Sequence, residues 1–206
     1  MSTDSIIEPL PELVELSLIA ELPCVTGRAN PEEHMYQLRL LREFDRNYLI
    51  TPAKIRDLWV MASRHKVLFS DYTDGKFLPF FNILMDPRGV WMEVAKEGSP
   101  VGVIYFTAII PLFDADFHFA LWDSIGAGRE PLALFALDWA MQRYGLHRVS
   151  AHVPVYQRGT LDSAERVGFV REGVTREGVV YRDEWVDLVD FGILRSEVEL
   201  QMTKLW

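Results

Sequence analysis

Apolar side chains in the N-terminal half of the chain recur mostly at helical spacing. Residues 31–48 begin with a proline typical of a helix start and carry apolar side chains three or four positions apart, which predicts an amphipathic helix. The same spacing predicts a second helix over 52–65. Residues 67–87 are rich in aromatic side chains without a regular period and are expected to be irregular. In the first 28 residues, helical spacing and strand-like alternation both fit, so both assignments stay open.

The period of the apolar positions changes from residue 88 onward and becomes typical of strands. Residues 90–96 and 101–110 are joined by a short turn and predict a hairpin. The run 115–122 predicts a third strand, on which Asp116 and His118 share one face because alternate side chains of a strand point to the same side. The elements expected after it are helices over 130–144 and 160–167, and strands over 148–153, 179–182 and 185–194.

Composition and charge narrow the class of protein. The chain has 206 residues and a formal net charge of −9, with 49% hydrophobic and 25% charged residues. This balance is typical of a folded globular chain, and the length fits one domain. The acidic surplus argues against broad nucleic-acid binding, because phosphate neutralisation needs clustered Lys and Arg.

Targeting and redox signals lead us to expect a cytoplasmic protein. Cys24 is the single cysteine, so no internal disulfide can form, and the chain suits a reducing compartment. The first basic residue is Arg28, so the N-terminus lacks the charged region of a secretory signal. The longest apolar stretch, 101–113, is shorter than the about 20 residues of a membrane-spanning helix, and no membrane association is expected.

A loop that contains glycine separates the strand 115–122 from the helix that follows. Gly126 and Gly128 stand on either side of Ala127, and Arg129 adds a cationic side chain. Glycines let backbone amides approach an anion, and the dipole of the following helix favours negative charge there. The spacing matches neither a P-loop nor the Gly-x-Gly-x-x-Gly dinucleotide motif. On spacing alone, an anion site and an ordinary strand-to-helix turn both remain open.

Four blocks of the C-terminal half occur in the order of a known family. They are the loop and helix start 126–132, the turn Gly145-Leu146-His147-Arg148-Val149, the segment Gly168-Phe169-Val170-Arg171-Glu172-Gly173, and the strand region 185–197. With these blocks, residues 88–196 resemble the GCN5-related N-acetyltransferase (GNAT) family, most closely its branch that acts on ribosomal-protein N-termini. Residues 1–87 carry no such block and are expected to be a divergent part with two helices.

The resemblance implies an α/β (α+β) fold with a mixed, curved sheet of about six or seven strands and helices on both faces. Two neighbouring parallel strands, 115–122 and 148–153, would splay apart in a V and hold the pantetheine arm of acetyl-CoA or another acyl-CoA. Residues 1–206 would then form a single domain, with 88–197 as its acyl-CoA-binding part. The cofactor-binding residues that the resemblance implies are Leu121, Trp122, Ile125, Gly126, Ala127, Gly128, Arg129, Gln157 and Thr160.

Three positions depart from the pattern of the family. Asp123 stands where relatives carry a polar or basic residue, and a carboxylate there opposes a diphosphate. The segment Gln157 to Thr160 replaces the Asn-x-x-Ser of relatives with chemically similar side chains. Ala164 stands where many relatives carry a tyrosine that protonates the departing thiolate, so that this proton would come from water or from another group.

Acyl transfer to an amine needs a base that removes a proton from the amine. His118 is the candidate, with Asp116 on the same strand face to orient the imidazole and raise its basicity. Relatives that act on arylalkylamines carry histidines at similar places. The alternative is that both side chains make ordinary polar contacts inside the sheet. His152 is expected to be a half-buried, hydrogen-bonded structural histidine, and no spacing of metal ligands is present, so no metal is expected.

The sequence leads to two hypotheses for function. The first is an acyl-CoA-dependent N-acyltransferase that transfers acetyl from acetyl-CoA to an amine, either a protein N-terminus or a small amine, by direct attack. The second is a catalytically inactive GNAT-fold module that binds CoA or a protein partner, which Asp123 and Ala164 motivate. The apolar faces of the helices expected in 1–87 either cover the sheet or serve an oligomer such as a homodimer.

Overall fold

The computed structural model describes residues 18–23, 35–43, 50–64, 76–122 and 128–205. The strands in these ranges are β1 (Leu18–Pro23), β2 (Met35–Arg42), β3 (Val90–Lys96), β4 (Ser99–Ile110), β5 (Asp114–Leu121), β6 (Arg148–Pro154), β7 (Val170–Tyr181) and β8 (Glu184–Leu194). The helices are α1 (Pro52–Arg64), α3 (Phe77–Leu84), α4 (Arg129–Tyr144), α5 (Arg158–Val167) and α6 (Arg195–Met202).

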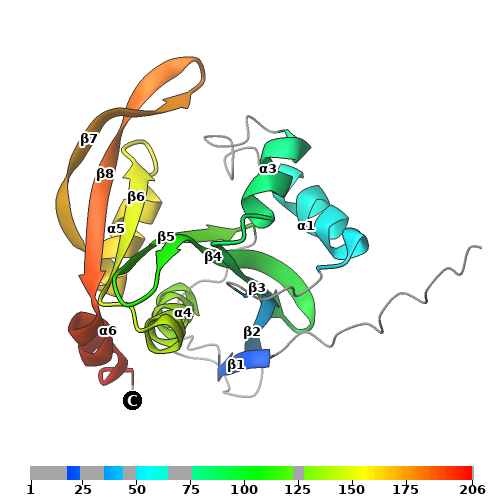
Figure 1. Ribbon diagram of the computed structural model, residues 1–206, viewed down its shortest axis with the longest axis horizontal. Helices are drawn as coiled ribbons and strands as arrows, with labels where there is room; N and C mark the ends of the chain where they lie inside the picture. Colours follow the sequence, from blue (N-terminus) through cyan, green and yellow to red (C-terminus); the bar gives the residue numbers. More distant parts are fainter. Residues whose placement is uncertain (1–17, 24–34, 44–49, 65–75, 123–127, 206) are drawn as a thin grey trace, which may run out of the picture.

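The strands form a single sheet in the order β1-β2-β3-β4-β5-β6-β8-β7 (Figure 1). Neighbouring strands are antiparallel except β5 and β6, which are parallel. The mixed sheet confirms the expected fold class, although the structure has eight strands where about six or seven were expected. The strands not predicted individually are β1 and β2, which pair at the sheet edge, so the strand alternative holds for residues 18–23.

The helix predicted over 31–48 is wrong, because its described part is the strand β2. Tyr36, Leu38 and Leu40 are buried, while the positions between them are partly exposed. The same apolar residues satisfy a helical spacing and a period of two, so the pattern alone does not separate the two structures. Pairing with β3 along most of its length gives β2 its hydrogen bonds, and this tertiary context outweighs local propensity.

The remainder of the N-terminal part contains two helices, one expected and one not. Helix α1 agrees with the prediction over 52–65, whereas α3 lies in the segment expected to be irregular. Phe80 of α3 packs between Trp59 of α1, with ring centroids 5.3 Å apart, and Trp91 of β3, at 6.2 Å. Aromatic contacts made across the fold therefore stabilise a short helix that has no regular apolar period of its own.

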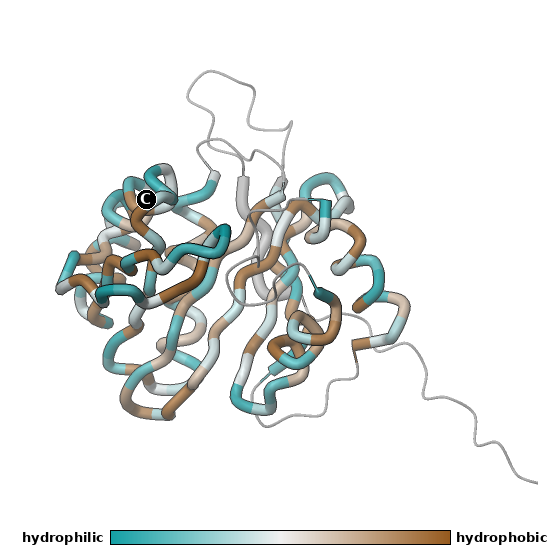
Figure 2. Tube along the Cα trace, turned by 90° about the horizontal axis from the view of Figure 1, so that it is seen from above, coloured by the Kyte–Doolittle hydropathy of each residue, from teal (hydrophilic) through white to brown (hydrophobic). Residues whose placement is uncertain are grey.

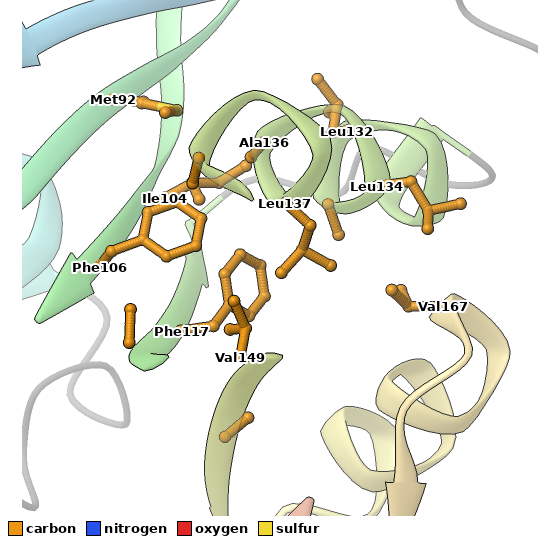
Figure 3. Packing of buried hydrophobic residues seen from close by; sticks show 14 of the residues in the cluster. Met92, Ile104, Phe106, Phe117, Leu132, Leu134, Ala136, Leu137, Val149 and Val167 are labelled. Atoms are coloured by element: carbon orange, nitrogen blue, oxygen red, sulfur yellow. The ribbon is translucent and has the colours of Figure 1, made fainter. Parts of the chain in front are cut away.

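Two hydrophobic cores lie on opposite faces of the sheet, which confirms helices on both faces. The smaller core joins α1 and α3 to β3 and β4. The larger core joins α4, α5 and α6 to the central strands, and Figure 3 shows Phe106 and Phe117 of the sheet facing Leu137 of α4. Figure 2 shows hydrophobic and hydrophilic residues interspersed along the chain trace.

The C-terminal elements extend beyond the predicted bounds. The helices α4 and α5 end at Gly145 and Gly168, as predicted, with φ angles of 68° and 111° that favour glycine. Strands β7 and β8 form a long ribbon that reaches past β6 (Figure 1), and the predicted strand 179–182 is only the end of β7. Helix α6 was not predicted; its Val198 is fully buried in the larger core.

Candidate active site

Strands β5 and β6 meet at one residue pair and then separate. Their parallel ladder joins Asp116 to Ser150 alone. Polar contacts secure this point, since Ser150 Oγ donates to Asp114 Oδ2 at 3.0 Å and Arg148 Nε lies 3.5 Å from the same oxygen. Each strand is held on its outer side, β5 by β4 and β6 by β8, so the gap between them stays open. The expected V-shaped splay is present.

A cavity of about 250 Å³ lies in this gap. Strands β5 and β6 supply its two sides, and helices α4 and α5 supply further lining. Most of the lining is apolar or aromatic, with a small number of polar side chains, as is common in ligand sites. The lining residues are Tyr105, Phe117, His118, Phe119, Ala120, Leu121, Arg129, Ala133, Ala151, His152, Val153, Pro154, Gln157, Thr160, Ser163, Ala164, Val167 and Phe169.

The starts of α4 and α5 contribute polar groups beyond the C-terminal ends of the splayed strands. Arg129 opens α4 and lines the cavity, and its buried Nε has no hydrogen-bond partner among the described residues. A buried donor without a partner is costly, and an anionic ligand would satisfy it. Gln157 caps the start of α5 and accepts a hydrogen bond from Thr160 Oγ1 at 3.2 Å; both side chains line the cavity.

The glycine loop itself is described only at its end. Ile125, Gly126 and Ala127, and also Asp123, lie outside the described residues, so their expected contacts stay predictions. Gly128 precedes α4, where an added Cβ would lie 2.9 Å from Cε2 of Tyr36. Close packing against a buried ring of β2 therefore requires glycine at this position.

Leu121 and Trp122 differ in their relation to the cavity. Leu121 lines it, as expected of a cofactor-binding residue. Trp122 instead packs against the smaller core, and its Nε1 donates to the Pro100 carbonyl at 3.0 Å. Trp122 therefore does not line the cavity. This hydrogen bond holds its indole toward the turn between β3 and β4.

His118 is held by two neighbours on β4, Thr107 and Tyr105. Its Nε2 shares a hydrogen bond of 2.8 Å with Thr107 Oγ1, and its ring stacks on Tyr105 with centroids 4.4 Å apart. Burial lowers the pKa of His118 to about 4; the charge of Asp116 opposes this shift, and His152 adds to it. The imidazole is therefore neutral at pH 7 and a weaker base than an ordinary histidine, so the expected rise in basicity from Asp116 is wrong: burial outweighs the charge of that carboxylate.

Asp116, expected to act on His118, also faces His152 across the splay. The imidazole Nε2 of His152 lies 3.7 Å from Asp116 Oδ1, and its Nδ1 lies 2.8 Å from Asp190 Oδ1. The carboxylate of Asp116, and then that of Asp190, raise the pKa of His152 to about 9 in spite of partial desolvation. His152 is therefore hydrogen-bonded, as predicted, but it is cationic at pH 7 and lines the same cavity as His118.

Several residues of the site were not found from the sequence. Tyr105 could have been predicted from the sequence. It lies directly opposite His118 in the β4–β5 ladder, and the alternation of side chains in a hairpin places both on one face. Asp190 carried no local signal, since it meets His152 only through the pairing of β6 with β8. Ala164 lines the cavity as a methyl group, so this position supplies no proton.

The part of the chain that the structure describes contains neither a metal-binding cluster nor a membrane-spanning helix. No group of three or more His, Cys, Asp or Glu side chains among the described residues is arranged to hold a metal ion. None of the described helices combines the length and the apolar character needed to span a membrane.

Solved structures of N-acetyltransferases share the fold of this chain. One is the spermidine N-acetyltransferase from Vibrio cholerae in complex with CoA and spermine, with a TM-score of 0.63 and 19% identity over 80% of this chain and 98% of that chain. A chimera of the same enzyme with hSSAT gives 0.61 and 18% over 80% and 98%. No protein-family model and no curated protein sequence match. At this identity, the likeness establishes the shared fold.

Proposed function

We propose that the protein is an acyl-CoA-dependent N-acyltransferase that transfers acetyl from acetyl-CoA to an amine by direct attack. The cavity between β5 and β6 carries the proposal, because it brings two histidines with opposite pKa shifts into one space with the polar starts of α4 and α5. Pairs of titratable groups driven apart in this way are typical of acid–base sites.

The lining fits acyl-CoA in both charge and shape. Arg129, with its unsatisfied buried Nε, and the side chains of Gln157 and Thr160 suit the diphosphate, together with the amides before α4. The apolar gap between β5 and β6 suits the pantetheine arm, whose amides would pair with free backbone groups of the separated strands. Ile125, Gly126 and Ala127 belong to this proposed diphosphate site.

The chemistry proposed for the site has three steps. The amine nitrogen loses a proton to the neutral imidazole of His118, which Asp116 assists from the same strand face. The free amine attacks the thioester carbonyl, and backbone N–H groups stabilise the oxyanion that forms, while the nitrogen gives up its second proton to water in the cavity. The carbon–sulfur bond then breaks, and the thiol leaves.

For the acceptor we propose a small amine, with a protein N-terminus as the second candidate. The solved relatives are spermidine N-acetyltransferases, one of them bound to spermine, which supports a polyamine. The net charge of −9 would steer cationic acceptors toward the protein and agrees with this choice. The protein N-terminus follows from the sequence blocks shared with the branch that acts on ribosomal proteins. A cytoplasmic location, where acyl-CoA is present, belongs to the same proposal.

We further propose that residues 1–206 act as one domain. Strand β2, from the N-terminal part, lies inside the sheet beside β3, and α1 and α3 share a core with β3 and β4. The apolar faces of these helices therefore cover the sheet. Light scattering after size exclusion would decide whether the protein is in addition a homodimer.

The test combines binding with turnover. Calorimetry with CoA and acetyl-CoA measures the cofactor site, and thiol release measures turnover on spermidine, spermine, simple monoamines and peptides with free N-termini. We expect binding of both nucleotides and release with at least one amine. Binding without release on any amine would favour the inactive module, and absence of binding would reject both hypotheses.

A further inference from the structure

His152 lies on the strand of the splay opposite His118 and takes no part in the steps described above. Its Nδ1 is fixed to Asp190 Oδ1 at 2.8 Å, and its Nε2 lies 3.7 Å from Asp116 Oδ1, longer than a hydrogen bond. The side chain is 39% exposed and lines the cavity. The Nε2 proton is therefore held near the reacting space without being locked to one acceptor.

Acyl transfer from a thioester ends with a thiolate that must gain a proton, since an ordinary thiol has a pKa of about 8.5. Ala164 of α5 offers none, and the hydroxyls of Thr160 and Ser163 are too weakly acidic. An arginine guanidinium does not act as a proton donor in proteins. Among the described cavity residues, an imidazole or the phenol of Tyr105 remains as the proton source.

The choice between these groups follows from their surroundings. His118 is neutral at pH 7, and the proton that it takes from the amine is released to water, because its pKa is only about 4. Tyr105 is only 5% exposed, with its ring stacked between Trp91 and His118. His152 is the group whose charge is maintained by two carboxylates, one on β5 and one on β8.

We propose that His152 is the general acid that protonates the departing thiolate, an inference that rests on the proposed acyl transfer. As the tetrahedral intermediate collapses, the carbon–sulfur bond breaks and its electron pair moves to sulfur. The Nε2 proton of His152 moves to the same sulfur and gives the thiol. The proton that Nδ1 shares with Asp190 stays in place, so the imidazole is left neutral.

The protons balance once water in the cavity is included. The ammonium of the acceptor loses one proton to His118, whose low pKa makes it release this proton readily to water in the cavity, and the nitrogen loses a second proton to that water after attack. The neutral His152 recovers one proton from the water, so in each turnover one of the two protons ends on sulfur and the other is released to solvent. A pKa of about 9 keeps His152 protonated at pH 7 and close in acidity to the thiol it serves.

Charged and titratable groups from the neighbouring strands surround His152. Asp116 and His118 face it from β5, and Asp190 faces it from β8. Thr175 of β7 donates to Asp190 Oδ2 at 2.9 Å and so fixes the carboxylate that holds Nδ1. Removal of either carboxylate charge should therefore lower the pH at which His152 loses its proton.

The test is the pH dependence of thiol release with acetyl-CoA and the best amine found. For the native protein we expect the rate to fall above about pH 9. His152→Gln should lower kcat about 100-fold and lose this descending limb, with CoA affinity nearly unchanged. Asp190→Asn should move the limb to lower pH. His147→Gln, which changes an exposed histidine absent from the cavity lining, is the matched control and should retain the native profile.

Each other result decides against the inference. A His152→Gln variant that keeps the descending limb, or an Asp190→Asn variant with an unshifted limb, overturns it, and the second variant decides if the first fails to fold. Loss of the limb in Tyr105→Phe alone would assign the acid to that phenol. These outcomes all require turnover by the native protein; if the native protein releases no thiol with any amine, the proposed function fails and the inference fails with it.

Discussion

The ring of His118 stacks on the ring of Tyr105, with centroids 4.4 Å apart and planes within 7°. Tyr105 stacks in turn on Trp91 at 4.0 Å, so a column of three rings runs from β3 across β4 to β5. Trp91 and Tyr105 belong to the smaller core, under α1 and α3. The N-terminal helices therefore help to fix the orientation of a cavity imidazole, although they lie outside the cavity lining.

Replacement of His118 by alanine should impair catalysis more than cofactor binding. We expect kcat to fall by about 100-fold or more, because general acid–base groups contribute 10²–10⁴-fold, while the Kd for CoA changes little. Thiol release and calorimetry measure the two quantities. His147→Ala is the matched control, since His147 is exposed and outside the cavity. A loss of CoA binding in His118→Ala would indicate a structural role.

Acid should destabilise the protein through His118. Its pKa of about 4 lies below the value of 6.5 for an ordinary histidine, so the unfolded chain takes up a proton more readily between these pH values. The free energy of unfolding should fall as pH drops from 6.5 to 4, by at most about 3 kcal/mol from this residue. Urea unfolding at several pH values measures the slope, which His118→Gln should reduce.

His152 changes the free energy of unfolding with pH in the opposite direction to His118. Its pKa is raised, so its stabilisation is complete below pH 6.5 and is lost as pH rises through 9. Taken together, the two histidines favour a stability maximum near pH 6.5. An acid slope that is equal in the native protein and in His118→Gln would contradict the assignment of the lowered pKa to His118.

Arg129→Met should weaken CoA binding. The guanidinium carries the buried donor without a partner, and loss of a charged hydrogen bond of about 1.5–3 kcal/mol corresponds to a Kd raised about 10- to 150-fold. Thermal unfolding of the free protein should change little. Arg195→Met, which removes a surface pair with Glu199 away from the cavity, should leave the Kd unchanged. Equal affinity of Arg129→Met and the native protein would place the diphosphate elsewhere.

Two glycine substitutions should have opposite effects on stability. In Gly102→Ala the new methyl would lie 2.7 Å from the Ala120 carbonyl oxygen and would also contact Leu121, so β4 and β5 must move apart. We expect a loss of about 1–3 kcal/mol and weaker CoA binding, because Leu121 lines the cavity. Gly159 lies in α5 with no atom near an added Cβ, and Gly159→Ala should stabilise the protein by up to about 1 kcal/mol. Thermal unfolding compares both variants with the native chain.

Lys54→Met should strongly destabilise the fold. Lys54 of α1 pairs with Glu93 of β3, whose side chain is 1% exposed, and Arg39 lies 3.9 Å away. Loss of one partner leaves a buried carboxylate poorly compensated, at a cost of about 3–5 kcal/mol in urea unfolding. Adding Glu93→Gln to this variant should recover part of the loss. If Lys54→Met and the double variant Lys54→Met with Glu93→Gln unfold at the same urea concentration, the pair of Lys54 and Glu93 does not stabilise α1 on the sheet.

The elements after residue 88 could be predicted from the sequence to within a residue or two for β3, α4 and β6. Local signals define them, namely a period of two bounded by turns, and a helix that ends at a left-handed glycine. The N-terminal part could not be predicted in the same way. Its segment 35–42 fits two periods, and the choice of strand follows from pairing with β3, whose partner residues lie 49 to 60 positions away.

Some features of the site could likewise be predicted from the sequence, and others could not. The sequence by itself determined that Asp116 and His118 share a face, because this depends on position along one strand, whereas the splayed strands and the place of Leu121, Arg129, Gln157 and Thr160 around the gap were implied by the resemblance of its motifs to the family. Only the tertiary structure decided the charge of each histidine. Burial over Tyr105 keeps His118 neutral, whereas two carboxylates from different strands keep His152 cationic. Desolvation and charge proximity depend on residues that meet only after the sheet has formed, and no local pattern encodes them.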